Sequence, residues 1–305
     1  MRRIVCAGVV LWLLGAGLAR AQVAVTELTP AAPRYFFSDA AGVTSATVTP
    51  DNPAALQWGA PSRVAFGAFQ LNEEDPATPN SEQVFKGKFA GFRGVGERWG
   101  FGIETLTAQR ELATLKETAS SGQLSFQVIP GLALGAGLDR AKTDTGTGVD
   151  TLEGRTFGLS VNLNKVFYLG YGMGTETLDD AGGVSGSRDT TLIGVAVRTE
   201  GSVRWHLAWD ELDKDDFTGT LSGKGFDATT ITVQAGLGNL LLGGQRFKLK
   251  TKTSTVEVRS TALDVGWAPD QGLTLTGRLA RSEASANGVV VQKGELRAVT
   301  IAYLW

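Results

Sequence analysis

The chain has 305 residues, with 29 basic and 31 acidic side chains, a formal net charge of −2 and one cysteine. This balance leaves no basic patch of the kind that nucleic acid requires, so we exclude a nucleic-acid partner. The 40 glycines and 42 % hydrophobic residues fit both a secreted soluble β-protein and a membrane β-barrel. The pattern along the chain has to separate these two classes.

Residues 1–21 have the layout of a cleavable signal peptide. Arg2 and Arg3 precede an apolar run over 4–18, and small residues lead up to a predicted cut after Ala21. A membrane-spanning helix is the rival interpretation, but the run is shorter than the roughly 20 residues that a bilayer needs. The mature chain then has 26 basic and 31 acidic residues and loses its only cysteine, which excludes disulfides and cysteine-based metal sites.

Residues 22–60 do not alternate and are rich in proline and small residues. We expect irregular structure with one short helix near Pro53 to Trp58. Asn52 is placed to cap that helix, and Pro53 suits its first position because proline needs no hydrogen-bond acceptor there.

Residues 61–305 alternate between apolar residues and small or polar ones, and turn residues separate the stretches. In the clearest case, Val203, Trp205, Leu207 and Trp209 share one face. Period two is typical of strands, and long strands with a glycine-rich opposite face favour an all-β, antiparallel, up-and-down outer-membrane barrel with an apolar exterior and a polar lumen. About fourteen strands, give or take two, are expected at 62–71, 82–94, 97–109, 115–129, 131–143, 150–164, 165–177, 187–199, 202–213, 226–236, 240–252, 255–267, 272–282 and 290–305.

Tight and longer connections alternate along this region. Short ones such as Pro130-Gly131 suit periplasmic hairpins. The longer polar ones suit the extracellular side, and we expect them at 72–80, 143–149, 179–187, 213–225 and 282–288.

The final strand ends on Tyr303 and Trp305, in step with Val299 and Ile301. It resembles the C-terminal strand by which outer-membrane proteins engage their insertion machinery. The expected location is therefore the cell outer membrane, with its lipid and the barrel-assembly machinery as partners.

A second resemblance lies before the first strand. The run Asp39–Ala46 and then Asp51-Asn52-Pro53-Ala54-Ala55-Leu56 resemble the FadL-like family of long-chain fatty-acid and hydrocarbon transporters. The resemblance implies a fourteen-stranded barrel whose N-terminal segment folds into the lumen as a hatch, with Asn52, Pro53 and Ala54 as the hatch motif. Family members are usually longer and have large ligand-capturing loops, whereas the loops here are short.

Several charged residues fall on the polar face of their strands, where lipid would not meet them. They can form a selectivity lining, or they can pair with each other and with the hatch. The candidate lumen residues are Arg198, Arg204, His206, Asp210, Asp264 and Arg278. By the same reasoning we expect Lys248, Lys250 and Lys252 to line the lumen or its rims.

Catalysis and metal binding have little support. His206 is the only histidine, and outer-membrane acyl hydrolases place a serine two residues after theirs, where this chain has Ala208. One histidine without cysteine offers no transition-metal site. The acidic residues between Glu211 and Asp216 lack the spacing of a known cation site and are interpreted as a solvated loop. We expect no enzyme activity, no metal and no cofactor.

The leading hypothesis is an outer-membrane barrel for passive transport of small, fatty-acid-like hydrophobic molecules. Two alternatives remain: a structural or interaction barrel, such as a secretion-system subunit, that transports nothing, and an open general porin.

Overall fold

The computed structural model describes residues 52–58, 62–74, 76, 83–110, 115–144, 146, 148–199, 202–218, 225–252, 255–267 and 272–304. In this part of the chain no helix is long and apolar enough to cross a membrane. The elements are η1 (Pro53–Gln57), β1 (Arg63–Glu74), β2 (Gln83–Val95), β3 (Trp99–Arg110), β4 (Lys116–Ile129), β5 (Leu132–Asp144), β6 (Val149–Leu163), β7 (Phe167–Asp179), β8 (Ser185–Arg198), β9 (Val203–Lys214), β10 (Phe226–Leu237), β11 (Leu240–Thr251), β12 (Val256–Trp267), β13 (Gly272–Ala286) and β14 (Val289–Leu304).

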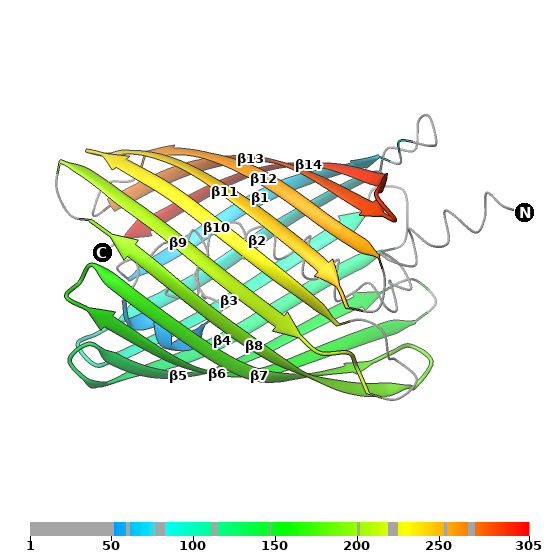
Figure 1. Cartoon of the computed structure of the whole chain (residues 1–305), viewed down its shortest axis with the longest axis horizontal. Helices are drawn as coiled ribbons and strands as arrows, with labels where there is room; N and C mark the ends of the chain where they lie inside the picture. Colours follow the sequence, from blue (N-terminus) through cyan, green and yellow to red (C-terminus); the bar gives the residue numbers. More distant parts are fainter. Residues whose placement is uncertain are drawn as a thin grey trace, which may run out of the picture.

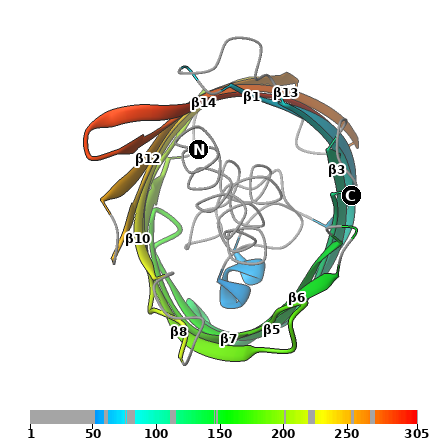
Figure 2. The ribbon, with the colours of Figure 1, turned by 90° about the vertical axis from the view of Figure 1, so that its right-hand side faces the viewer.

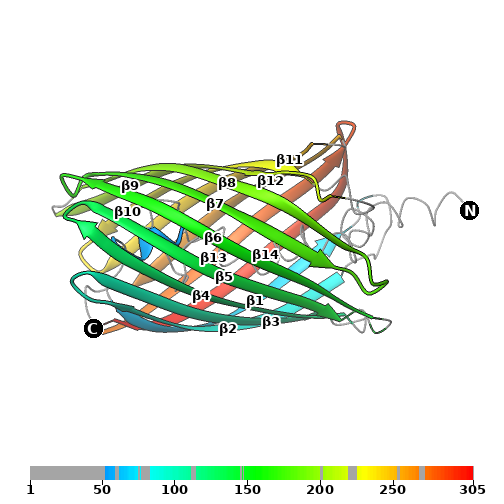
Figure 3. The same ribbon diagram turned by 90° about the horizontal axis from the view of Figure 1, so that it is seen from below.

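The fourteen strands form one closed antiparallel barrel in which each strand pairs with its sequence neighbours. The ring closes between the first and last strands, from Arg63 opposite Leu304 to Glu74 opposite Lys293. The tilted strands and the closed ring are visible in three directions (Figures 1, 2 and 3). The predicted fold and strand number are confirmed, and closure leaves no strand edge unpaired.

The connections gather at two ends, which we call the turn end and the loop end. The turn end holds the short links such as that between β4 and β5, and β14 finishes there. The link between β13 and β14, at the loop end, differs from the prediction. Instead of a loop over 282–288, β13 runs to Ala286, and Asn287 and Gly288 turn the chain with φ angles of 52° and 79°. Two left-handed residues in an Asn-Gly pair make the tight hairpin that continues both strands.

The outward face of the wall changes character along the barrel axis. On β9, Trp205, Leu207 and Trp209 are exposed near the turn end, but Glu211 and Asp213 follow on the same face. The other strands repeat this order, so an apolar band surrounds the half of the barrel near the turn end, which we call the turn half. A band of this kind faces lipid in a membrane-spanning barrel. The loop half, by contrast, has a polar and charged exterior.

The 3₁₀ helix η1 lies inside the ring, against the inner wall of β3 to β7 (Figure 2). Asn52 caps it by accepting a hydrogen bond from Ala54, and Pro53 stands in its first turn, as the sequence predicts. The predicted signal peptide and residues 22–51 of the predicted hatch lie outside the described residues, as does Trp305.

Candidate functional site

The candidate site is the inner wall of the barrel, which divides into the same two halves. In the turn half the inward side chains are small or polar, and in the loop half many are aromatic or aliphatic. The polar inward positions of the turn half include Arg63, Arg93, Gln123, Ser125, Ser160, Gln234, Gln245, Thr274 and Thr300.

An ion pair between Arg278 and Asp264 crosses from β13 to β12 in the turn half. Nε of Arg278 lies 2.6 Å from Oδ1 of Asp264, and Nη2 donates to Oδ2 over 2.8 Å. Gln245 of β11 lies beside the pair, with its Oε1 3.5 Å from the same Nη2 and its Nε2 donating to Thr232 at 3.2 Å. The structure thus brings together two of the predicted lumen residues in a buried polar network, which stabilises them because each charge has a partner.

The other four candidate lumen residues lie on β8 and β9, also in the turn half. His206 and Asp210 are buried on the inner face, 4 % and 6 % exposed. Arg204 donates from Nη2 to the carbonyl of Gly238 in the β10–β11 turn over 2.7 Å. Arg198 stands opposite His206 at the end of the β8–β9 ladder. All four have the orientation that the alternation predicts, and a role in transport stays a prediction.

The hatch motif is seated on a flat patch of the inner wall. The Asn52 amide donates to the carbonyl of Leu159 on β6 at 3.0 Å. A Cβ at Gly158 would overlap the Asn52 side chain, and one at Gly135 would overlap the backbone of Pro53 and Ala54. Glycine at these two positions is therefore what allows η1 to lie so close to the sheet.

Two further contacts fix the far end of η1. Arg93 of β2 donates to the carbonyl of Leu56, whose side chain is fully buried. Gln57 donates from Nε2 to the carbonyls of Gly96 and Glu97 in the β2–β3 turn, over 3.1 and 3.2 Å. The segment from Asn52 to Gln57 is thus tied to three separate strands and one turn.

Two apolar clusters occupy the inner wall of the loop half. The first spans β1 to β3 and β12 to β14, and the second spans β5 to β7 and β10 to β12. The first cluster contains Phe69, Leu71, Phe85, Phe89, Leu106, Ala108, Leu115, Ala262, Ala280, Leu296 and Ala298. The second contains Ala141, Leu152, Leu178, Phe217, Phe226, Ala228, Phe247, Leu249, Val256 and Val258.

A charged group that the sequence analysis missed adjoins the second cluster. Glu176 of β7 lies between Arg188 of β8, at 2.5 Å, and Lys214 of β9, at 2.7 Å. The Arg188 guanidinium also lies 4.6 Å from the ring centroid of Phe217 and 5.4 Å from that of Phe226. The group thus places one carboxylate and two basic side chains against aromatic rings, whose faces favour cations.

The sequence did contain a signal for this group. Glu176 and Arg188 are direct cross-strand partners in the β7–β8 hairpin, so correct pairing from the Asp180 turn would have joined them.

Lys248, Lys250 and Lys252 were predicted to line the lumen or its rims, and of these two placements the lumen is wrong. Phe247 and Leu249 of β11 are 3 % exposed and point inward, so the intervening lysines point outward. Their charge is tolerated there because this part of β11 lies beyond the apolar band, whereas the prediction assumed that the band covers the whole strand.

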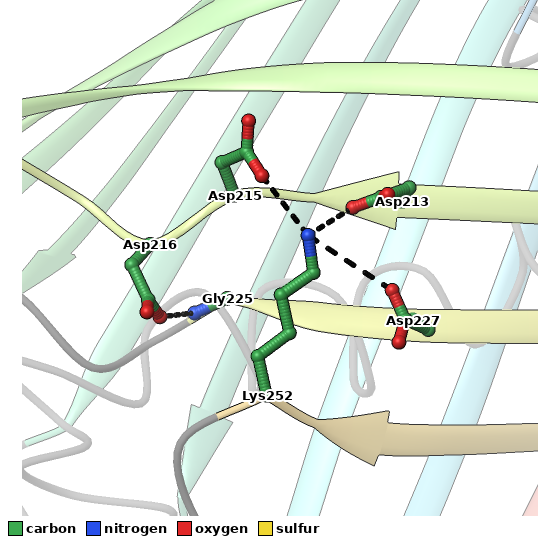
Figure 4. A network of polar contacts seen from close by, with 6 residues as sticks. All are labelled: Asp213, Asp215, Asp216, Gly225, Asp227 and Lys252. Atoms are coloured by element: carbon green, nitrogen blue, oxygen red, sulfur yellow. Dashed lines mark hydrogen bonds and ion pairs between the residues drawn. The ribbon is translucent and has the colours of Figure 1, made fainter.

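Lys252 and the acidic loop that follows β9 form one cluster on the outside of the loop end (Figure 4). The Lys252 ammonium contacts Asp213, lies 2.9 Å from Asp215 and lies 4.0 Å from Asp227. Partial burial lowers the pKa of Lys252, but the hydrogen bonds and charges of Asp213 and Asp215 outweigh it and raise the pKa overall. A single lysine thus offsets part of the negative charge of this acidic group. The described residues hold no cluster of three His, Cys, Asp or Glu arranged for a metal.

At the C-terminal strand, Tyr303 points outward and is 53 % exposed, between its cross-strand partners Val64 and Leu273. It belongs to the edge of the apolar band at the turn end. Aromatic residues favour this level in membrane barrels.

No protein-family model matches the sequence, and no curated protein is significantly similar to it. Solved structures do match the barrel. A mutant of the TodX monoaromatic hydrocarbon channel aligns with a TM-score of 0.60 and 10 % identity, over 88 % of this chain and 98 % of its own. A Pseudomonas aeruginosa FadL homologue aligns with a TM-score of 0.58 and 11 % identity, over 90 % and 97 %. The Ralstonia pickettii toluene transporter TbuX aligns with a TM-score of 0.56 and 11 % identity, over 84 % and 92 %. The chain therefore has the barrel fold of FadL-like transporters, as the hatch motif and strand number predict.

Proposed function

We propose that the chain is an outer-membrane channel for the passive transport of small hydrophobic molecules. The observation that carries the proposal is the pair of apolar clusters on the inner wall of the loop half, where a porin would need a wetted surface. Structures of the same fold are described as a hydrocarbon channel and as toluene transporters, which supports this class of ligand.

The loop end faces the outside of the cell in this proposal, and the signal peptide is removed after Ala21. Ligand enters between the loops and partitions onto the two apolar clusters, because transfer of apolar surface from water is favourable. It then meets the polar turn half, where η1 and the rest of the 22–60 hatch close the straight aqueous path. Passage requires the hatch to shift from its seat on Gly135 and Gly158.

The Glu176, Arg188 and Lys214 group extends the ligand range to amphipathic molecules. Its two basic side chains can donate hydrogen bonds to a carboxylate, while the adjacent Phe217 and Phe226 suit an alkyl chain. A fatty acid combines both features. In this proposal the six predicted lumen residues line the polar exit in the turn half. They are Arg198, Arg204, His206, Asp210, Asp264 and Arg278.

Uptake by proteoliposomes tests the proposal, with toluene and oleate as probes. The Phe89→Gln/Phe247→Gln variant changes one residue of each apolar cluster. Phe167→Gln, on the outward face at the turn end and away from both clusters, is a single-substitution control. We expect toluene uptake to fall about tenfold in the first variant, equivalent to about 1.4 kcal/mol, and to stay unchanged in the second. Equal uptake by all three proteins would contradict the proposal.

Single-channel conductance in a planar bilayer provides the complementary measurement. Little conductance is expected if the proposed hatch obstructs the lumen beside η1. Large steady steps would favour an open porin instead. Deletion of residues 22–58 should abolish selective hydrocarbon uptake while the barrel still assembles, and unchanged selective uptake would count against a hatch.

A non-transporting structural barrel is the second candidate, and one observation favours it. The β13–β14 connection at the loop end is a two-residue turn at Asn287 and Gly288, too short to capture a ligand. Recovery of a stoichiometric partner, together with no uptake of either probe, would support this candidate.

A further inference from the structure

The outward charges of the loop half are divided between two arcs of the wall. The basic arc covers β11 to β14, β1 and β2, and the acidic arc covers β5 to β10. The basic arc has nine cations, Lys86, Lys88, Arg246, Lys248, Lys250, Arg259, Arg281, Lys293 and Arg297, against four anions, Glu74, Glu257, Glu283 and Glu295. The acidic arc has three cations, Arg140, Lys142 and Arg155, against seven anions, Asp144, Glu153, Asp179, Asp189, Glu211, Asp213 and Asp227. The net charges are +5 for the basic arc and −4 for the acidic arc. Cations and anions are therefore segregated around the wall of the loop half.

The basic arc begins directly where the apolar band ends. On β13 the outward residue after Leu279 is Arg281, and on β14 Arg297 adjoins Val299. Strand pairing places Arg281 opposite Glu295 and places Arg297 opposite Leu279. Side chains at this level of a membrane barrel lie among the lipid headgroups of one leaflet.

The cations of the arc are accessible. The side chains of Arg259, Arg281 and Arg297 are 62 %, 79 % and 72 % exposed. Glutamates lie among these cations, but each of the two carboxylates that pair with them is shared by two cations. Glu295 lies 2.5 Å from Arg297 and 3.7 Å from Arg281, and Glu257 pairs with both Arg259 and Lys248. Each shared carboxylate neutralises only one of its two cations, so the arc keeps its positive charge.

We propose that the basic arc binds the phosphate groups of anionic lipid in the leaflet that surrounds the loop half. Arginine suits this ligand because its guanidinium can donate two parallel hydrogen bonds to a phosphate. Long basic side chains also extend from apolar surface towards headgroups. A lipid with several phosphates fits best, since the cations are spread over six adjacent strands. The acidic arc repels the same lipid, so only one side of the loop half binds anionic lipid.

Lipid retention by the full-length protein, purified from the outer membrane of a Gram-negative host, tests the proposal. The Arg246→Gln/Lys250→Gln/Arg281→Gln variant removes three charges from the basic arc. The matched control, Arg140→Gln/Lys142→Gln/Arg155→Gln, removes three from the acidic arc. After delipidation, each protein is titrated with lipid A or with its dephosphorylated form, and bound lipid is counted by native mass spectrometry. Heat-dependent mobility in gels verifies that both variants fold.

Because each basic residue near an anionic surface adds to the attraction, removal of three should weaken lipid A binding by the basic-arc variant at least about tenfold. The control should bind as the wild type does, and dephosphorylated lipid should bind all three proteins equally and weakly. Equal lipid A binding by both variants would overturn the proposal. So would a lipid-independent dimer that the basic-arc variant dissociates, because the arc would then contact the acidic arc of a second copy.

Discussion

The two halves of the barrel have opposite distributions of polar and apolar side chains between exterior and interior. In the turn half the exterior is apolar and the interior is polar and glycine-rich, whereas in the loop half the exterior is charged and much of the interior is aromatic or aliphatic. A single strand shows the exchange: β11 turns Leu242 outward near one end and Phe247 inward near the other. Contact with lipid hydrocarbon requires an apolar exterior in the turn half. The exterior of the loop half lies beyond the hydrocarbon, and this half can place apolar side chains inside.

The largest expected effect tests the polar interior of the turn half. Arg278→Leu leaves Asp264 without its cation in a position where the two side chains are 0 % and 2 % exposed. Breaking a buried pair from one side costs about 3–5 kcal/mol. The free energy of unfolding in urea should fall accordingly, and Asp264→Leu/Arg278→Leu should recover part of the loss. No recovery in the double variant would show that the packing of Arg278, not its charge, stabilises this half.

The next effect tests where lipid begins and ends. Leu207→Arg introduces a charge in the apolar band, whereas Thr177→Arg introduces one on the outward face of the loop half. The first should cost about 2–4 kcal/mol of unfolding free energy near the bilayer midplane, and the second should cost about 0–1 kcal/mol. Equal costs in urea titrations of vesicle-embedded protein would mean that lipid hydrocarbon covers both halves.

A smaller effect concerns the seat of η1. Gly158→Val places a side chain where the Asn52 amide now lies, and Gly122→Val, where a Cβ meets no atom within 4 Å, is the control. We expect a loss of about 1–3 kcal/mol from overpacking in the first variant only. Protease cleavage near residue 58 should then accelerate. Unaltered cleavage would indicate that the strand, and not the helix, moves to accept the valine.

The smallest effect is at the outer rim of the loop half. Lys252→Met removes the cation shared by Asp213 and Asp215 and should cost about 0.2–1 kcal/mol, as partly exposed ion pairs do. Because the folded-state pKa of Lys252 is raised, its contribution is fully present at neutral pH and is lost as alkaline pH passes through that pKa. The stability difference between wild type and variant should therefore shrink above the ordinary lysine range. A difference that persists there would assign the effect to packing.

The strands could be predicted from sequence because alternation and turn residues are local signals. Alternation identifies two faces, but it does not say at which residue the membrane ends. For this reason alternation alone places Lys248 and Lys250 in the lumen or at its rims, although the apolar Phe247 and Leu249 alternate with them on the opposite face. The point at which apolar side chains change from the outer to the inner face depends on the position of each residue along the barrel axis. Only the assembled barrel defines that position.

The site was predictable to a similar degree. The short helix after Asn52 follows from capping chemistry, and its seat on Gly135 and Gly158 could not be foreseen, because those contacts span more than 80 residues. The group around Glu176 combines two strand neighbours with Lys214, a residue brought close only by the ladder of the next strand. Long-range register, and not residue type, is what single-sequence reasoning lacked here.

The pairing of β1 with β14 has a consequence for the folding of the barrel. Every residue of β1 pairs with β14, so one edge of β1 has no partner until β14 is in place and the ring can close. Until Leu304 is available, two strand edges stay open, and such edges pair readily with other chains. Closure also joins residues more than 200 positions apart, a contact order that makes folding slow. We therefore expect a chain truncated by one strand to aggregate instead of forming a smaller barrel, and expect a chaperone to guard the open form during export.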